Sequence, residues 1–352
     1  MTDIIAGLSA NWLAKRQAKS LSKERAKALA ANPNLPQEEF QKAREAVLGK
    51  DFATTLAGTP CIPCMANGKA ARRAARLSLV NQSVVGCPEH AKEAARLRQD
   101  MDQIEHARAA DAVYLKYDPD APADLKAPPP GFLDPSDEEL ASLGLTTDQL
   151  APEGSNFRAA VYKKDPAVWG SDPKPPYDVV FRGSTLAEED WVNNFAKNAN
   201  NESDYYQRAT LIGNAIAKAG SADQVQLVGH SLGGGLATAA QGGSGSIATT
   251  FNAAGLNPHT VAKYSKIKDR VAAEPDKILA YHVDGEVVTK TQESGILQYL
   301  SHPAPGQHKV TPPTSDALSA EDRHGMVEVI GSMEKQKNAD EAVLMACIAS
   351  IC

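Results

Sequence analysis

The sequence predicts an α/β fold with a mainly parallel sheet, preceded by an all-helical region, because three features follow one another along its 352 residues. Residues 1–110 are rich in strong helix formers such as Ala, Lys, Glu and Leu and show no strand pattern. Six prolines then fall within residues 118–136 and indicate an extended connection. From residue 156 onward, short apolar strands alternate with helices, which is typical of a parallel sheet covered on both faces. We therefore expect a helical N-terminal region at 1–110 and an α/β domain at 111–352.

Individual elements can be assigned from periodicity and composition. The expected strands are 157–162, 177–181, 225–228, 247–251 and 278–283. The expected helices are 37–48, 89–110, a short one near 140–150, 205–219 and 232–240.

Charge and hydropathy exclude some classes of protein. The net charge of -6 and a pI near 5.8 argue against a nucleic-acid partner, which would favour a basic excess. No apolar run approaches the roughly 20 residues that span a bilayer. The basic cluster 15–27 follows the mildly apolar residues 1–13, the wrong order for a secretory signal. We expect a protein made in the cytoplasm that leaves the cell, if it does, without a cleaved signal.

A Gly-x-Ser-x-Gly motif stands where a strand meets a helix. The strand 225–228 runs directly into the motif, residues 229–233, and a helix of small residues follows. The glycines are needed because the chain reverses sharply at the serine, where side chains would collide. The turn places the Ser231 hydroxyl at the carboxyl edge of the sheet, beside the positive end of the next helix. The sequence therefore predicts Ser231 as a nucleophile of the α/β-hydrolase type, with the Leu232 amide as an oxyanion donor.

A serine nucleophile needs a base and a carboxylate that orients this base. In this type of fold they follow in the order Ser, Asp or Glu, His. Asp284 comes directly after the strand 278–283, at the sheet edge that carries Ser231. We expect Asp284 to be the acid. Glu286 is the nearby rival, and Asp284 could instead only cap a turn with Gly285.

Three histidines follow the acid in the chain. His324 stands at the start of an apolar-periodic helical run, where it can be packed firmly from behind, whereas His302 and His308 lie in a loop rich in Pro and Gly. We expect His324 to be the base, with His308 as the second choice. His230 precedes the nucleophile, points away from it, and is expected to make a structural hydrogen bond.

The strand 177–181 ends in Arg-Gly-Ser-Thr, residues 182–185, and Asp190–Trp191 follows. The Gly-x-Ser-x-Gly turn at 229–233, called the nucleophile elbow below, and the strand end at 251–253 complete the pattern. Together these residues resemble the class 3 lipases over roughly residues 110–335. The resemblance implies an α/β-hydrolase fold and a lipid-ester substrate.

The resemblance to the class 3 lipases also implies that Ser184 supplies the second oxyanion contact through its backbone N–H. Two donors aimed at one oxyanion are required on physical grounds as well. Arg182 is expected to tie the loop to a neighbouring carboxylate, in preference to binding substrate.

The Pro-rich connection, the strand near 156–162 and the His-Gly-Met element at 324–326 look most like bacterial lipases used as type VI secretion effectors. That resemblance implies phospholipase A-type attack on membrane lipids of rival cells, delivery on a secretion-machinery carrier into the target periplasm, and an immunity protein. No clear lid helix can be identified.

Four residues of the N-terminal region have the pair spacing of a tetrahedral zinc site: Cys61, Cys64, Cys87 and His90. A disulfide among these cysteines and free thiols packed between helices are the alternatives. Cys347 and Cys352 could pair in an oxidising compartment. The helical region itself is expected to be a loading or partner-binding module, or a cover for the active site.

The leading hypothesis is a lipolytic serine esterase with the triad Ser231, Asp284 and His324, a chemistry that requires no cofactor. A soluble carboxylesterase or thioesterase is the rival within the class. A binding protein on an inactive hydrolase scaffold is the rival from another class.

Overall fold

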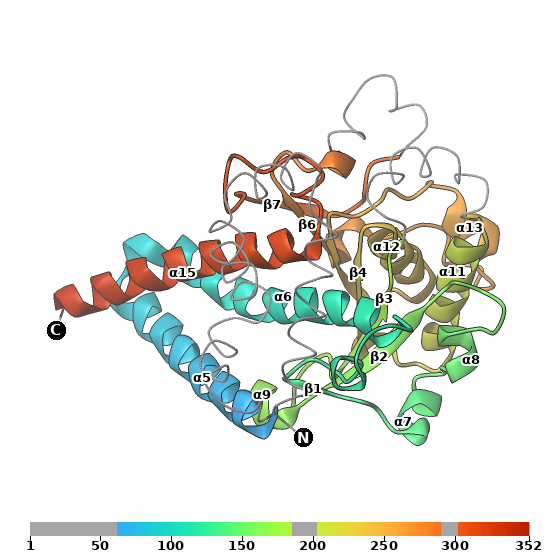
Figure 1. Ribbon diagram of the computed structural model, residues 1–352, viewed down its shortest axis with the longest axis horizontal. Coiled ribbons are helices and arrows are strands. Elements are labelled where there is room, and N and C mark those ends of the chain that lie inside the picture. Colours follow the sequence, from blue (N-terminus) through green and yellow to red (C-terminus); the bar gives the residue numbers. More distant parts are fainter. Residues whose placement is uncertain (1–61, 185–202, 290–301, 352) are drawn as a thin grey trace.

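The computed structural model describes residues 62–184, 203–289 and 302–351, and a seven-stranded sheet forms its centre (Figure 1). The strands lie side by side in the order in which they occur in the chain. β2 is antiparallel to both β1 and β3, whereas all neighbours from β3 to β7 are parallel. The mainly parallel sheet predicted from the sequence is therefore confirmed. The strands are β1 (Phe132–Leu133), β2 (Ala159–Lys164), β3 (Tyr177–Phe181), β4 (Val225–His230), β5 (Ile247–Phe251), β6 (Ile278–Val283) and β7 (Gln307–Thr311).

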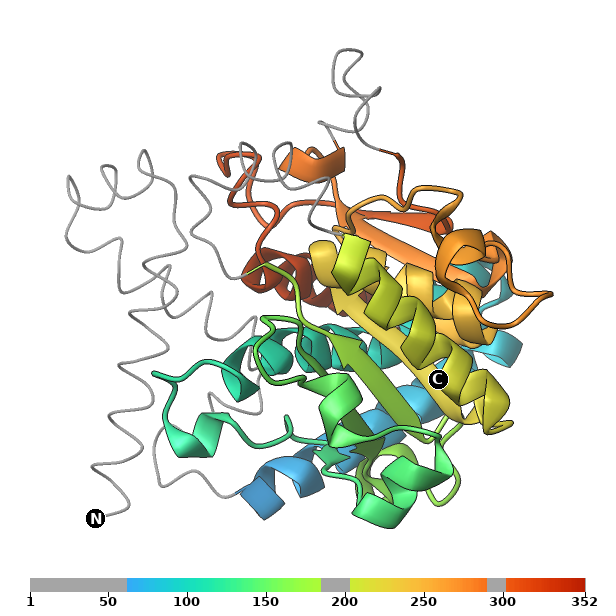
Figure 2. The same ribbon diagram turned by 90° about the vertical axis from the view of Figure 1, so that its right-hand side faces the viewer.

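Helices cover both faces of the sheet (Figures 1 and 2). One face carries α11 and α12, with α13 beside them, and the other carries α6 and α15, against which α5 packs. Because both faces are covered, every residue of β3 and β4 is buried. The longer helices are α5 (Ile62–Gly86), α6 (Ala91–Lys116), α11 (Ser203–Lys218), α12 (Leu232–Ser244) and α15 (Met326–Ile351). The shorter ones are α7 (Asp137–Ser142), α8 (Thr147–Leu150), α9 (Pro166–Trp169) and α13 (Thr260–Tyr264), with 3₁₀ turns η1 (Pro88–His90), η2 (Ala123–Leu125), η3 (Ala222–Gln224) and η4 (Pro275–Lys277).

Small residues let α11 and α12 approach each other closely. A Cβ added at Gly213 would lie 2.2 Å from the carbonyl oxygen of Ala240, and one added at Gly243 would lie 2.5 Å from that of Thr210. Neither site accepts a side chain unless the backbone moves. The small-residue helix that follows the nucleophile therefore holds α11 tightly over the sheet.

The opposite layer is built from both ends of the described chain. Apolar side chains of α6 and α15, among them Ile104, Val113 and Ile330, form one core with the strands. The boundary expected at residue 110 falls inside α6, so this helix spans the two expected regions.

Partly buried ion pairs join the helices of this layer. Arg108 of α6 contacts Glu334 of α15 at 2.8 Å, and Arg76 of α5 contacts Glu341 of α15 at 2.9 Å. Burial raises the pKa of Glu334, but the charges of Lys337 and Arg108 outweigh it and hold this pKa at about 2. The carboxylate therefore stays ionised, and the helices are fixed in register by charge as well as by apolar contact.

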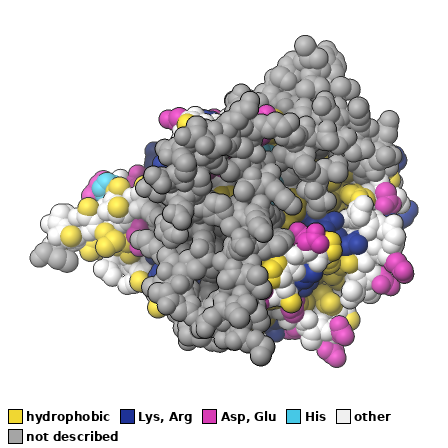
Figure 3. All heavy atoms as spheres, viewed as in Figure 1, with side chains coloured by type: hydrophobic (Ala, Val, Ile, Leu, Met, Phe, Trp, Pro, Cys, Tyr) yellow, Lys and Arg dark blue, Asp and Glu magenta, His cyan; other side chains and the backbone are white. Residues whose placement is uncertain are grey.

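The far ends of α5 and α15 project from the body of the molecule (Figure 1). They lie together, since a Cβ at Gly86 would come within 3.2 Å of Ile351. Hydrophobic side chains are visible at this tip in Figure 3, and Val85 is 85% exposed while Met345 is 57% exposed. No helix in the described ranges is both long and apolar enough to cross a membrane.

Candidate active site

The turn between β4 and α12 holds Ser231 in a backbone conformation that few residues adopt. Its φ is 57° and its ψ is -127°, a strained region for a residue with a side chain. A Cβ at Gly229 would lie 2.0 Å from the carbonyl oxygen of Gly233, and a Cβ at Gly233 would lie 2.2 Å from that of Phe181. Both glycines are therefore required by close backbone approach, as the motif predicts.

Three side chains form a continuous hydrogen-bonded chain at the end of this turn. Nε2 of His324 is 3.0 Å from Oγ of Ser231, and Nδ1 of the same ring is 2.7 Å from Oε2 of Glu286. All three residues are buried. The arrangement lets the imidazole take the serine proton while the carboxylate fixes its tautomer and orientation.

The carboxylate that reaches His324 belongs to Glu286, and the structure does not bring the expected acid, Asp284, to the site. Asp284 is exposed, and its backbone N–H continues the pairing with β7 by donating to Thr311. The chain then turns at Gly285, with φ at 72°, and this turn carries Glu286 inward until it is fully buried. The physical reason for the difference is that β6 ends at Val283, and a two-residue turn, Asp284–Gly285, separates it from the carboxylate that faces the histidine.

Glu286 is held as an anion. Its carboxylate accepts hydrogen bonds from the backbone N–H groups of Val288 at 2.8 Å and Thr289 at 2.5 Å. Burial raises the pKa of Glu286. The hydrogen bond and charge of His324, together with the hydrogen bonds from Thr289, lower it by more than burial raises it, so the pKa lies below its usual value. An ionised carboxylate is what orientation of the imidazole requires.

The loop that carries His324 is fixed from beneath through its main chain. Nε2 of His230 donates to the carbonyl oxygen of His324 at 2.8 Å, and Nδ2 of Asn252 donates to the same oxygen at 2.9 Å. Oδ1 of Asn252 accepts from the N–H of Val283, the last residue of β6. Asn252 has a φ of 42°, which asparagine tolerates better than most residues. It therefore connects the ends of β5 and β6 with the base, a role that its sequence position alone does not reveal.

The side chain of His230 makes structural hydrogen bonds, as the sequence predicts, to the His324 carbonyl and to Tyr114. Its Nδ1 accepts from the Tyr114 hydroxyl at 3.1 Å. Burial, followed by the neighbouring His324, lowers the pKa of His230 to about 3, so it remains neutral. His302 and His308 are exposed, and His308 donates to the Ala304 carbonyl at 3.1 Å. Of the sequence-predicted bases, the structure brings only His324 to the serine.

Of the two expected oxyanion donors, Leu232 belongs to the nucleophile turn and Ser184 to the loop that follows β3. Leu232 is the first residue of α12, so its N–H has no partner within the helix. Ser184 is half-buried and follows Gly183, where a Cβ would lie 2.7 Å from the carbonyl oxygen of His230. The loop before Ser184 thus passes directly beside the elbow.

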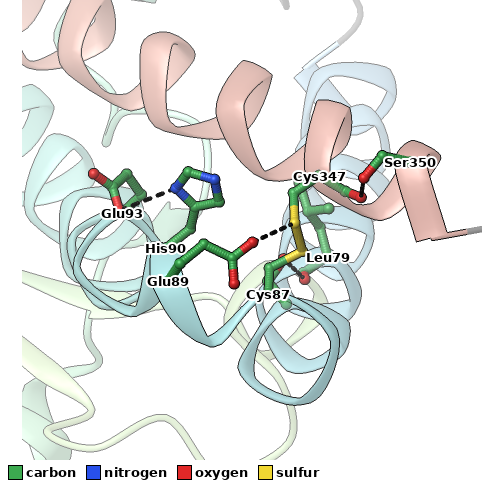
Figure 4. Close-up of a disulfide and its surroundings, with 8 residues drawn as sticks. Leu79, Cys87, Glu89, His90, Glu93, Cys347 and Ser350 are labelled. Atoms are coloured by element: carbon green, nitrogen blue, oxygen red, sulfur yellow. Dashed lines mark hydrogen bonds and ion pairs between the residues drawn. A yellow bond between two sulfur atoms is a disulfide. The ribbon is translucent and has the colours of Figure 1, made fainter.

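The expected zinc site is not formed. Cys87 is joined by a disulfide to Cys347 of α15, and a sulfur in this bond cannot act as a thiolate ligand (Figure 4). Nδ1 of His90 lies 3.8 Å from Oε2 of Glu93. Cys64 falls within α5, and Cys61 lies outside the described residues, as does Cys352. Cys347 could have paired with Cys352, but it is bonded instead to Cys87, which links α15 to the residue before η1.

Comparison with known proteins assigns the chain to a family. Residues 105–316 match the family of phospholipase-like proteins described as the Tle-like phospholipase domain, a range that includes Ser231 and Glu286. An extracellular phospholipase A1 from Serratia liquefaciens is 32% identical over 224 residues, which are 59% of this chain and 65% of that protein. The chain thus spans somewhat less than two thirds of the relative's length. On the extent of the family match, the chain belongs to the Tle-like phospholipase family.

Proposed function

We propose that the protein is a serine hydrolase that cleaves carboxylic ester bonds of phospholipids, with a triad of Ser231, His324 and Glu286. The buried chain from Oγ of Ser231 through His324 to the Glu286 carboxylate is the observation that carries this proposal. An inactive scaffold would have no need to keep three polar groups buried and aligned beside a strained serine. The similarity to a phospholipase A1 supports phospholipids as the substrate class.

The geometry supports a two-step reaction. Oγ of Ser231 attacks the ester carbonyl carbon while its proton passes to Nε2 of His324. The amides of Ser184 and Leu232 hold the oxyanion that forms. When this intermediate collapses, the ester C–O bond breaks and the leaving alkoxide takes the proton from His324. Water, deprotonated by the same imidazole, then attacks the acyl-serine and releases the fatty acid and the free serine.

The test compares the wild type with Ser231→Ala on phospholipid vesicles, triacylglycerol emulsions and short soluble esters. We expect fatty acid release from phospholipid by the wild type and a loss of at least a thousandfold in the variant. Unchanged hydrolysis by the variant would refute the nucleophile. Activity confined to short soluble esters would instead favour a soluble carboxylesterase or thioesterase.

We also propose that the enzyme is an antibacterial effector of the type VI secretion kind, delivered on a carrier into the periplasm of a rival cell and neutralised by an immunity protein. The family match and the resemblance noted in the sequence support this role. Directed to the periplasm of a host bacterium, the wild type should arrest growth and Ser231→Ala should not. Equal growth of both strains would count against an effector.

A further inference from the structure

Two arginines lie next to each other at the catalytic edge of the sheet. Arg158 directly precedes β2 and Arg182 directly follows β3, and the backbone N–H of Arg182 donates to the carbonyl of Arg158 at 3.0 Å. Because β2 runs antiparallel to β3, both residues stand at the edge where β4 ends in the nucleophile turn. With strands roughly 5 Å apart, Arg182 lies about one strand from β4 and Arg158 about two.

Both guanidinium groups lie over the ring of Tyr117, which follows α6. Their distances to the ring centroid are 5.7 Å for Arg158 and 6.0 Å for Arg182. The Tyr117 hydroxyl is occupied, since it donates to the Ala159 carbonyl at 2.7 Å. One aromatic ring thus has two cations close to it, an arrangement that their mutual repulsion opposes.

No carboxylate of the described residues forms an ion pair with either arginine. Arg158 donates through Nη1 to backbone carbonyls, including that of Phe157 at 2.7 Å, and Arg182 donates through Nη2 to the Asn156 carbonyl at 2.9 Å. Nε of Arg182 is buried and has no hydrogen-bond partner among the residues that the structure describes. Burial and the charge of Arg158 both lower the pKa of Arg182. Elsewhere, Arg96 and Arg108 each contact a carboxylate, that of Asp340 and that of Glu334.

We propose that Arg158 and Arg182 bind the phosphate of the lipid substrate and so select phosphate-bearing glycerides over neutral ones. Guanidinium groups match phosphate oxygens with paired, charge-assisted hydrogen bonds. In a glycerophospholipid the phosphate is attached to the same glycerol that carries the ester bonds. An ester carbonyl at Ser231 therefore leaves the phosphate within reach of the neighbouring strand ends. This inference rests on the function proposed above and adds to it a determinant of substrate selection.

The experiment measures kcat/KM for phosphatidylglycerol and for a diacylglycerol with the same acyl chains, both highly diluted in micelles of a neutral detergent so that the lipid adds little surface charge. The ratio of the two values is the readout, because general damage to the site lowers both alike. We expect this ratio to fall at least tenfold in Arg158→Gln and Arg182→Gln. Arg158→Lys, which keeps the charge and loses the planar fork, should give an intermediate ratio. Arg208→Gln is the matched control, since Arg208 lies on α11 and contacts Asp204 at 2.8 Å.

An unchanged ratio in Arg158→Gln and Arg158→Lys, with both variants folded as judged by circular dichroism, would overturn the proposal. Equal losses on both lipids in all arginine variants, with wild-type phospholipid cleavage intact, would overturn it while leaving the proposed function in place. If the wild type cleaved neutral esters and no phospholipid, the proposed function and this inference would both be wrong.

Discussion

Oε2 of Glu286 and Nδ1 of His324 are 2.7 Å apart, and the carboxylate comes from a turn beyond the end of β6. Asp284, the residue that directly follows β6, is exposed. The acid of this site therefore reaches the histidine from a turn. Of the two neighbouring carboxylates, that of Glu286 is buried and that of Asp284 is exposed.

Replacement of Glu286 by Gln should lower kcat by about a thousandfold or more, because the neutral side chain no longer stabilises the protonated imidazole or fixes its tautomer. Asp284→Asn is the matched control and should change kcat by less than about threefold, because substitutions at exposed positions usually have small effects. Steady-state hydrolysis of a soluble ester measures both. A larger loss in Asp284→Asn than in Glu286→Gln would reverse the assignment of the acid.

Asn252→Asp should lower kcat by roughly 10- to 100-fold with little change in KM, since a small displacement of a catalytic group has costs of this size. The aspartate keeps an oxygen for the Val283 N–H but loses the Nδ2 donor to the His324 carbonyl. Asn257→Asp is the control, because Oδ1 of Asn257 only accepts from the N–H of His259 in an exposed turn. Equal kcat values for the two variants would show that the donor does not position the base.

Asp100→Asn should stabilise the protein at neutral pH and have little effect near pH 4. Asp100 is 1% exposed and accepts hydrogen bonds from Tyr281 and Gln336. Burial is the main cause that raises its pKa from 3.8 to about 6. The folded protein thus binds this proton more tightly than the unfolded chain, and the wild-type free energy of unfolding falls as the pH rises from about 4 to 6.

The asparagine carries no charge to bury, so the variant's advantage should grow across that window to about 3 kcal/mol at most. Urea denaturation at several pH values measures it, with the 76% exposed carboxylate of Asp172, changed to Asn, as the control. An advantage that did not vary between pH 4 and 7 would contradict burial as the cause.

Cys347→Ser should lower the free energy of unfolding by about 2–5 kcal/mol, because the disulfide with Cys87 closes a long loop and restricts the unfolded chain. A reducing agent should destabilise the wild type by a similar amount and leave the variant unchanged. Thermal unfolding with and without reductant measures this. A wild type indifferent to reductant would show that the two sulfurs are not bonded in solution.

The central strands could be predicted from sequence because burial on both faces leaves a plain apolar signature. The predicted ranges 177–181, 247–251 and 278–283 agree with β3, β5 and β6. β7 was not predicted, since this edge strand exposes Gln307, His308 and Val310 and so lacks an apolar pattern.

Two features of the site could not be read from the sequence. The choice between Asp284 and Glu286 depends on the direction of a turn at Gly285, which spacing alone does not fix. The pairing of Cys87 with Cys347 joins residues 260 positions apart, and only the packing of α15 brings them together. Ser231, by contrast, was indicated by local steric demands that its neighbouring glycines meet.

The order of the strands in the sheet has a consequence for when activity returns as the chain folds. Each strand from β2 to β7 pairs with the one before it in the chain, so no strand has to be inserted between two earlier ones. The loop of His324 leads directly into α15, whose Glu334 contacts Arg108 across 226 positions. Contacts this distant close a long loop and form slowly. During refolding, hydrolysis should therefore return after the strand signal, at the rate at which the last helix reaches the first ones.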